Sequence, residues 1–377
     1  DTVTAPHGFV VSYKYDEAGN LTELTYPGNK KVIYRYDELN RLRTVKIDWL
    51  NLTATYTYKD RENRPTLLDN YMNFNGIVTS YNFDKAQRLT GMTSPVATYS
   101  FPEIDGNGNR KLEVRNEPLM PLLYAYDIWY NYNDKGNRLT GVEGAFWWLN
   151  FGFDDEGQLS FTAPGTIYYT FDYEHRLVNL MGPPQQFYYD GMGNRLKAIR
   201  GGVPVATYYI YDAAGNLLAE ADSSKNITSY YVYGAGLLAM VTVPENQVYS
   251  YHFNPIGSTI AITDQSQAMV NKYSYDPFGG IMAQVETIPQ PFKFVGQFGV
   301  MREYDSSLYY MKARYYSAWF GRFISEDPIG FAGGDVNLYT YVGNNPVMRV
   351  DPRGLRLVAT TLPGLGNTYL DDSFIPS

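Results

Sequence analysis

The sequence predicts an all-β fold in which antiparallel β-hairpins pair side by side into one continuous sheet. The chain of 377 residues contains 37 Tyr, 19 Phe and 5 Trp, and aromatic side chains favour the pleated, half-buried surface of a sheet. It also contains 34 Gly and 21 Pro, which supply the turns that many short strands need. A short motif recurs with a period of about 22 residues, as in repeat architectures.

The repeated motif reads aromatic-Asp-x-x-Gly-Asn, then Arg or Leu, then Leu. The aspartate can accept hydrogen bonds from backbone N–H groups two residues on, which starts a turn. Gly-Asn supplies the positive-φ positions of a tight hairpin, and an alternating strand follows, as in Leu21 to Tyr26. Each repeat therefore predicts one hairpin of two strands. Copies begin at Tyr15, Tyr36, Phe83, Tyr132, Phe153, Phe171, Tyr189 and Tyr211, with weaker copies at Asp60, Asp105, Tyr233, Asn254 and Tyr275.

Stacking these hairpins edge to edge would pair every interior strand and leave only two terminal edges. The tyrosines recur near the same point of each unit, so we expect them to align as ladders across the strands. A long continuous sheet must also twist and coil. These points predict a curved wall of hairpins over residues 1–291.

Some segments depart from the repeat. The step from Asp105 to Asp134 is the longest, and its stretch from Glu113 to Leu123, with two prolines, predicts an inserted loop. Thr287 to Pro291 predicts a linker, and the period is lost from Phe292 onward. Residues 301–320 are compatible with a short helix or with one irregular strand pair. We therefore expect an irregular core over residues 292–355 and a variable tail over residues 356–377.

The composition excludes several classes of function. The chain has no Cys, which excludes disulfides and thiol chemistry. Its 31 Lys+Arg against 39 Asp+Glu give a net charge of −8, and without a basic run we expect no nucleic-acid partner. No apolar stretch reaches the roughly 18 residues of a membrane-spanning helix, and residues 1–10 resemble no signal peptide.

The sequence predicts no metal site and no cofactor. His7, His175 and His252 are far apart in sequence and match no metal-ligand spacing. There is no Gly-x-Ser-x-Gly elbow and no phosphate-binding loop. The repeated turn aspartates could bind calcium as an array, but a capping role in the turns is favoured.

The chain resembles RHS-repeat proteins, also called YD-repeat proteins, near its C-terminal end. Their core signature is a proline, four arbitrary residues and Asp-Pro-any-Gly-Leu, which here runs from Pro346 to Leu355. The lead-in from Arg314 to Gly330 and the run from Asn337 to Val347 are also similar, in the same order. One departure is Ser317-Ala318, where the family commonly has Asp-Pro.

The resemblance implies a hollow or open shell that cuts its own chain after the signature, at Leu355–Arg356. The implied catalysts are Asp327 and Asp351 with Arg322 in support, and Asp335 is a less certain match. Two carboxylates that share a site cannot both ionise easily, so one can activate water while the other donates a proton, as in aspartic proteases. The alternative is structural, because Asp-Pro-x-Gly is also an ordinary turn sequence. Glu326, beside Asp327, could disturb the carboxylate pair or be its true partner.

Two functions follow as hypotheses. The first is the encapsulation shell of a secreted or cell-surface bacterial toxin system. Any enzymatic activity would be limited to self-cleavage. Its partners would be its own C-terminal effector segment and further shell or secretion subunits. The chain would then be the C-terminal section of a longer shell, or a small open version. The alternative is a non-catalytic module that binds carbohydrate or protein at the cell surface, with exposed tyrosines stacking on sugar rings. The two differ in whether the tyrosines face a closed interior or solvent.

Overall fold

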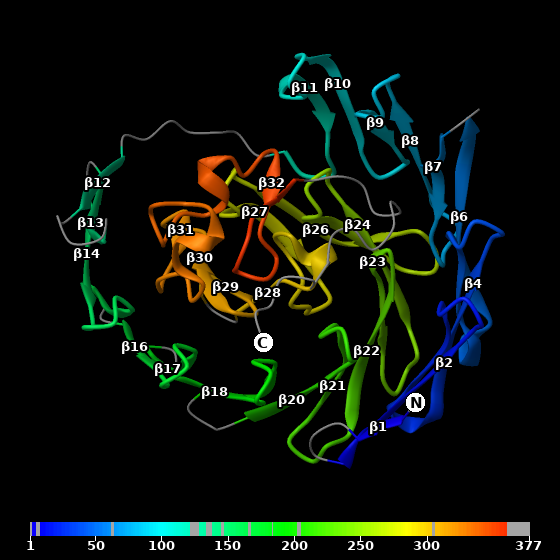
Figure 1. Ribbon diagram of the computed structural model, residues 1–377. Helices are drawn as coiled ribbons and strands as arrows, with labels where there is room; N and C mark the ends of the chain where they lie inside the picture. Colours follow the sequence, from blue (N-terminus) through cyan, green and yellow to red (C-terminus); the bar gives the residue numbers. More distant parts are fainter. Residues whose placement is uncertain are drawn as a thin grey trace.

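The computed structural model describes residues 2–4, 8–61, 64–120, 128–132, 138–144, 147–164, 167–182, 184–201, 205–303 and 306–359. Within them the chain forms β-strands and short 3-10 turns, which confirms the predicted all-β class. The strands form two long antiparallel sheets, each ordered as in the sequence. In Figure 1 the second sheet curls around the C-terminal core, and the first sheet lies outside part of it.

The first sheet contains eleven strands in sequence order. The strands are β1 (Thr2–Thr4), β2 (Val10–Tyr15), β3 (Leu21–Tyr26), β4 (Lys30–Tyr36), β5 (Leu42–Ile47), β6 (Leu52–Arg61), β7 (Arg64–Met72), β8 (Val78–Phe83), β9 (Leu89–Thr93), β10 (Thr98–Ile104) and β11 (Arg110–Asn116). Two 3-10 turns, η2 (Pro27–Asn29) and η3 (Asp48–Leu50), lie at the ends of β3 and β5.

The second sheet contains sixteen strands. The strands are β12 (Ile128–Tyr132), β13 (Leu139–Gly144), β14 (Trp147–Phe153), β15 (Leu159–Ala163), β16 (Ile167–Phe171), β17 (Leu177–Met181), β18 (Gln185–Tyr189), β19 (Arg195–Arg200), β20 (Val205–Tyr211), β21 (Leu217–Ala221), β22 (Ile227–Gly234), β23 (Gly236–Thr242), β24 (Val248–Phe253), β25 (Thr259–Thr263), β26 (Met269–Tyr275) and β27 (Ile281–Glu286). Among the described strands, β12 and β27 do not pair, so the curled sheet is open.

The core segment, residues 292–355, is short-stranded and rich in turns. The strands are β28 (Met301–Arg302), β29 (Leu308–Met311), β30 (Arg314–Ser317), β31 (Arg322–Phe323) and β32 (Arg349–Val350), with η4 (Gly296–Phe298), η5 (Gly330–Gly333) and η6 (Val342–Asn344). The strand β33 (Val358–Ala359) pairs with β32. The sequence left residues 301–320 compatible with a short helix or with a strand pair, and the structure shows strands.

The turn motif folds as its residues predict. In the first hairpin Asp16 Oδ1 accepts the N–H groups of Ala18 at 3.0 Å and Asn20 at 2.8 Å. The same capping recurs in hairpin after hairpin, which favours the turn role of these aspartates. One detail differs from the prediction: Gly19 alone adopts a positive φ, of 83°. Asn20 instead donates its side-chain amide to Asp16 Oδ2 at 3.0 Å.

The tyrosine before each turn links one repeat to the preceding one. The hydroxyl of Tyr36 donates to the carbonyl of Leu21 at 3.1 Å, and that of Tyr189 donates to Leu177 at 2.6 Å. The ring is therefore buried between strands while its hydroxyl satisfies a backbone acceptor. This bond explains why the motif begins with an aromatic residue that is usually tyrosine.

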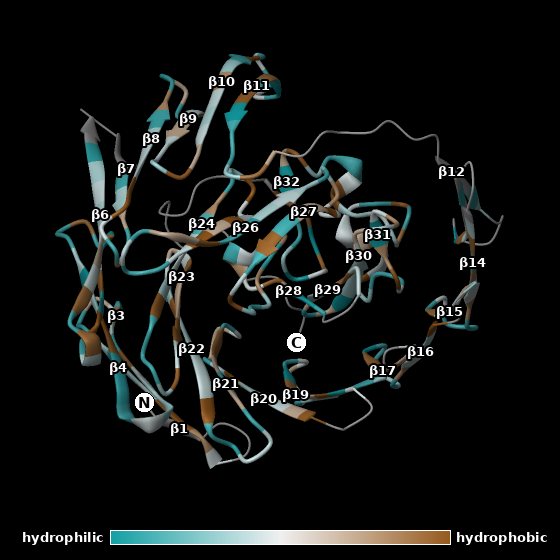
Figure 2. Cartoon of the chain, turned by 180° about the vertical axis from the view of Figure 1, so that it is seen from behind, coloured by the Kyte–Doolittle hydropathy of each residue, from teal (hydrophilic) through white to brown (hydrophobic). Residues whose placement is uncertain are grey.

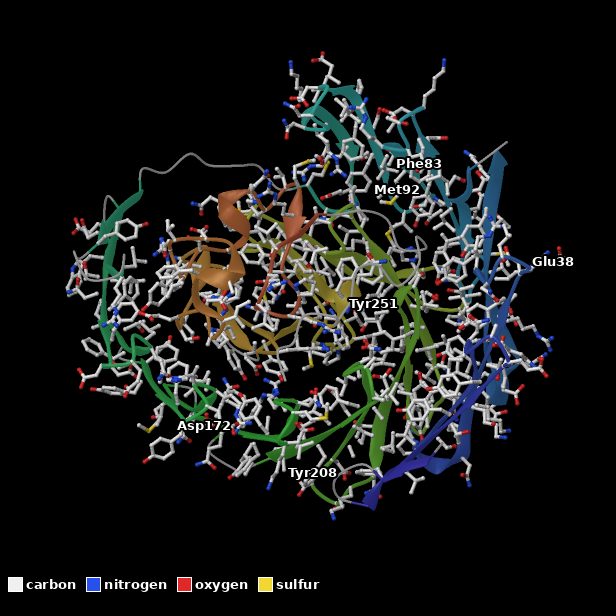
Figure 3. The ribbon with its side chains drawn as sticks, in the orientation of Figure 1. Glu38, Phe83, Met92, Asp172, Tyr208 and Tyr251 are labelled. Atoms are coloured by element: carbon white, nitrogen blue, oxygen red, sulfur yellow. The ribbon has the colours of Figure 1, made fainter. Side chains whose placement is uncertain are left out.

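The two sheets stack as layers. The hydroxyl of Tyr26 donates to the carbonyl of Tyr231 at 3.0 Å, and that of Tyr230 donates to Pro27 at 3.0 Å. Figure 2 shows hydrophobic residues along β22 to β24, where the first sheet and the core segment lie on opposite sides. In Figure 3 Tyr251 lies in this interior, whereas Glu38 lies at the outer edge. More than half of the tyrosines whose burial is described are buried.

Two sequence-based expectations need correction. The inserted loop was predicted to begin at Glu113, but residues up to Asn116 belong to β11 and pair with β10. The hairpins also form two sheets within the described residues, where the sequence predicted one. The turn around Asp134, most of the tail (residues 360–377) and His7 lie outside the described residues. Within the described part, no helix is long and apolar enough to span a membrane.

Candidate autoproteolytic site

A small cavity lies in the core segment beside the bond predicted to be cut. It is lined by Arg314, Asp327, Asp351, Leu355 and Arg356, among others. Its volume is about 20 Å³, which is room for about one water molecule. The fold thus brings two aspartates that are distant in sequence to one space next to the Leu355–Arg356 peptide.

Asp351 binds the predicted scissile peptide directly. Its Oδ1 accepts the N–H groups of Leu355 at 3.1 Å and Arg356 at 3.2 Å. The side chain is only 4% exposed, and this burial raises its pKa to about 6, against the opposing charge of Arg314. A carboxyl group with this pKa holds a proton in about half of the molecules at pH 6 and in about one in ten at pH 7.

Asp327 lines the same cavity. Its Oδ1 accepts the N–H of Ile329 at 3.0 Å, as in an ordinary turn. Its Oδ2 is free of that turn and pairs with Arg314 Nη2 at 2.8 Å. Burial raises the pKa of Asp327, and the Arg314 charge opposes the rise. The turn interpretation and the chemical one are therefore compatible, because each carboxylate oxygen serves one role.

Gly333 lets Asp327 and the scissile carbonyl approach each other. A Cβ atom at Gly333 would lie 2.6 Å from Asp327 Oδ2 and 3.3 Å from the Leu355 carbonyl oxygen. A side chain would occupy the space between these two groups. The glycine therefore keeps the carboxylate open toward the peptide.

Arg314 is the buried cation that contacts both aspartates of the site. Its Nη2 lies 2.8 Å from Asp327 Oδ2 and 3.6 Å from Asp351 Oδ2. Its Nε donates to the carbonyl of Gly354 at 2.6 Å, and its Nη1 donates to that of Leu338 at 2.9 Å. The guanidinium is thus fixed by several partners at once, which the single ammonium of a lysine could not match.

The other residues predicted for the site lie elsewhere or at its margin. Arg322 does not line the cavity; its Nη2 donates to the hydroxyl of Tyr132 at 2.8 Å. Asp335 does line the cavity, and its Oδ1 accepts the N–H of Asn337 at 2.9 Å. Glu326 binds Tyr339 at 3.0 Å and does not line the cavity. In this geometry Arg314 contacts both Asp327 and Asp351, whereas Arg322 and Glu326 do not line the cavity.

Sequence reasoning missed Arg314 although the signal was present. The residue opens the strand Arg314–Ser317, in which two tyrosines follow it. All four residues of this strand are buried, and a buried arginine requires carboxylate or carbonyl partners. An arginine within a strongly aromatic strand was therefore a better candidate than one beside a glycine turn.

The described histidines have structural roles. His175 adopts a positive φ of 61° in a repeat turn, and its Nδ1 lies 2.9 Å from Gln158 Nε2. His252 is buried, and its Nε2 lies 2.8 Å from Thr263 Oγ1. Burial lowers the pKa of His252 to about 4, so it is neutral near pH 7.

Comparison with known proteins places the chain in a family. The RHS Repeat model matches residues 2–31 and 15–51, and the Teneurin YD-shell model matches residues 69–347. The tRNA3(Ser)-specific nuclease WapA of Bacillus spizizenii is 32% identical over 360 residues, covering 91% of this chain and 14% of the relative. Toxin protein Tse5 of Pseudomonas aeruginosa is 44% identical over 66 residues, covering 18% of this chain and 5% of the relative.

Solved structures share the fold. The Photorhabdus luminescens Tc holotoxin pore matches with a TM-score of 0.65 at 18% identity, covering 95% of this chain and 22% of that chain. The chain therefore spans a small part of the length of the proteins it matches. Since the Teneurin YD-shell model covers residues 69–347, well over half of the sequence, the chain belongs to the YD-shell family of RHS-repeat proteins.

Proposed function

We propose that this chain is the shell section of a toxin system, that it encloses a C-terminal effector segment, and that it cuts its own Leu355–Arg356 bond. The observation that carries the cleavage proposal is the hydrogen bonding of Asp351 to both N–H groups flanking that bond. Relatives named as toxins or nucleases support the toxin setting. The burial of the described tyrosines gives the carbohydrate-binding alternative less support.

The proposed reaction is hydrolysis by a carboxylate pair that shares one proton. Asp327, ionised beside Arg314, takes a proton from a water in the cavity, and the water oxygen attacks the carbonyl carbon of Leu355. Arg314 stabilises the negative charge that develops. As the bond breaks, the nitrogen of Arg356 gains a lone pair and takes a proton from the Asp351 carboxyl group, whose Oδ1 lies 3.2 Å away and accepts the N–H of that nitrogen in the intact chain. The products are a carboxylate at Leu355 and an amine at Arg356.

The direct test is intact-mass analysis of the wild-type chain and of Asp327→Asn. The wild type should lose the 22 residues after Leu355 (377 − 355 = 22), whereas the amide variant, which cannot take the proton from water, should stay whole. Asp335→Asn is the matched control: it removes a carboxylate at the same cavity that has no step in the reaction, so the variant should be cut. A single uncut wild-type species would sink the proposal.

Cleavage should slow as the pH rises above about 6, because Asp351 must carry a proton and its pKa is raised to about 6. For one required proton the rate falls about tenfold for each pH unit above that pKa. Freshly translated chains can be diluted into buffers from pH 5 to pH 8.5 and followed by the appearance of the short fragment. A rate that climbs steadily up to pH 8.5 would contradict the role of Asp351 as the acid.

A further inference from the structure

A buried ion cluster joins the wall of the shell to the core segment. Arg195, on strand β19, pairs through Nη1 with Oε1 of Glu303, just after β28. Arg200, at the end of β19, lies 3.1 Å from the other oxygen, Oε2. The side chains of Arg195 and Glu303 are 1% and 0% exposed. One buried carboxylate therefore holds two wall arginines at the junction.

Aromatic rings enclose the Arg195 guanidinium. Its centre lies 5.2 Å from the ring of Phe187, 4.9 Å from that of Tyr209 and 4.7 Å from that of Tyr310. A cation among aromatic rings is held by the negative faces of those rings. The first two rings belong to the wall, and the third belongs to the core segment. The position of Arg195 is thus fixed from both sides.

The cluster touches the hairpin that carries the catalytic arginine. Arg195 Nη1 donates to the hydroxyl of Tyr315 at 3.1 Å, and the hydroxyl of the wall residue Tyr189 lies 3.0 Å from the same oxygen. On the partner strand, Tyr310 donates to the carbonyl of Gly193 at 2.8 Å. Side chains alternate along a strand, so Tyr315 faces the wall while its neighbour Arg314 faces the cavity.

We propose that Arg195 and Glu303 are positioning residues for self-cleavage, and that they act by fixing the β29–β30 hairpin so that Arg314 reaches both aspartates. This inference rests on the proposed cleavage at Leu355–Arg356. Stability alone does not explain the choice of residues, because a well-packed hydrophobic group often replaces a buried ion pair without loss. The ion pair instead gives the hairpin a defined place on the wall. Cleavage then depends on correct docking of the core segment against strands β18 and β19.

The test compares cleavage rates of full-length wild type, Arg195→Met and Arg195→Lys, with chains translated for a few minutes and diluted into buffers from pH 5 to pH 8.5. A misplaced catalytic group slows a reaction by roughly tenfold or more, so Arg195→Met should cleave at least about tenfold more slowly. With Arg314 displaced, the carboxylates lose its charge, and the pH profile should move to higher pH. Arg195→Lys keeps a charge beside Glu303 and should recover most of the rate.

Arg88→Met is the matched control. Arg88 also binds a carboxylate, that of Asp84, at 2.7 Å. It lies in a turn between β8 and β9 of the first sheet, and its replacement should leave both the rate and the pH profile unchanged. If Arg195→Met does not fold, Tyr315→Phe removes only the hydroxyl that receives the Arg195 contact, and it should also slow cleavage.

The outcomes separate the two proposals. An uncut wild type overturns the cleavage proposal, and the positioning role falls with it. If the wild type is cut and Arg195→Met keeps the wild-type rate and pH profile, only the positioning role is overturned. Where Arg195→Met does not fold, the same result in Tyr315→Phe overturns it. Equal slowing by Arg88→Met and Arg195→Met also overturns it, because the effect would then be a general one on the wall.

Discussion

Replacing Arg314 by methionine should leave the chain uncut. Methionine fills much of the same space but cannot pair with Asp327, which Arg314 contacts at 2.8 Å, or hold the Gly354 carbonyl at 2.6 Å. Removing one preorganised electrostatic group from a catalytic site slows a reaction by about 100-fold to 1000-fold. The measurement is the time course of the short fragment by intact mass. Arg314→Lys should remain slow, since one ammonium cannot make these contacts together.

Arg322→Met is the decisive control, because Arg322 is the arginine that the sequence motif indicated. Its guanidinium lies 4.9 Å from the ring of Tyr132, and it does not line the cavity, so its loss should leave cleavage within about threefold of wild type, a change of under 1 kcal/mol in the barrier. A reversed result, with Arg322→Met uncut and Arg314→Met cut normally, would return the catalytic role to Arg322. Circular dichroism of both variants shows whether either has lost the fold.

Tyr316→Ala should have the largest effect on stability. Tyr316 is fully buried and lies at the centre of an aromatic cluster, with ring centroids 4.4 Å from Tyr341 and 5.8 Å from Phe323. Its hydroxyl also donates to the carbonyl of Phe278 at 2.7 Å. Truncating a buried aromatic residue to alanine lowers the free energy of unfolding by about 3–5 kcal/mol. Denaturant unfolding measures this loss, and cleavage should weaken with it, because Arg314 is on the same strand.

Two further tyrosine variants should lose less stability than Tyr316→Ala. Tyr316→Phe keeps the ring and loses one hydrogen bond, for about 1 kcal/mol. Tyr168→Ala removes a tyrosine that is 50% exposed and should change stability by less than about 0.5 kcal/mol. Equal losses in Tyr316→Ala and Tyr168→Ala would show that the aromatic cluster does not hold the core segment together.

The hairpin fold could be predicted because its determinants are local. Asp16, Gly19 and Asn20 lie within one turn, and the hydrogen bonds that cap this turn join residues at most four positions apart. The division into two sheets could not be predicted in this way. It depends on which layer each strand packs against, and the hairpins of both sheets carry the same turn motif.

The candidate site was predictable only in part, for the same reason. Asp327 and Asp351 stand in recognisable motifs, and the turn after Asp351 places its carboxylate against Leu355 within a few residues. The arginine could not be chosen by proximity in sequence, because Arg322 is nearer to Asp327 than Arg314 is. Pairing of β29 with β30 and burial of both strands decide which guanidinium enters the cavity.

The sequence by itself determined the repeated hairpins and the capped turns. Both depend on short-range hydrogen bonds and side-chain alternation, which neighbouring residues specify. Asp327 and Asp351 were indicated by their motifs, but the fold brings them to one cavity. Only the tertiary structure decided the stacking of two sheets, the choice of Arg314 and the link through Arg195 and Glu303. The stacked sheets and the Arg195–Glu303 pair join residues more than a hundred positions apart, and Arg314 reaches Gly354, 40 positions away. Such contacts follow from packing and burial, of which the aromatic strand that Arg314 opens gives only an indirect sign.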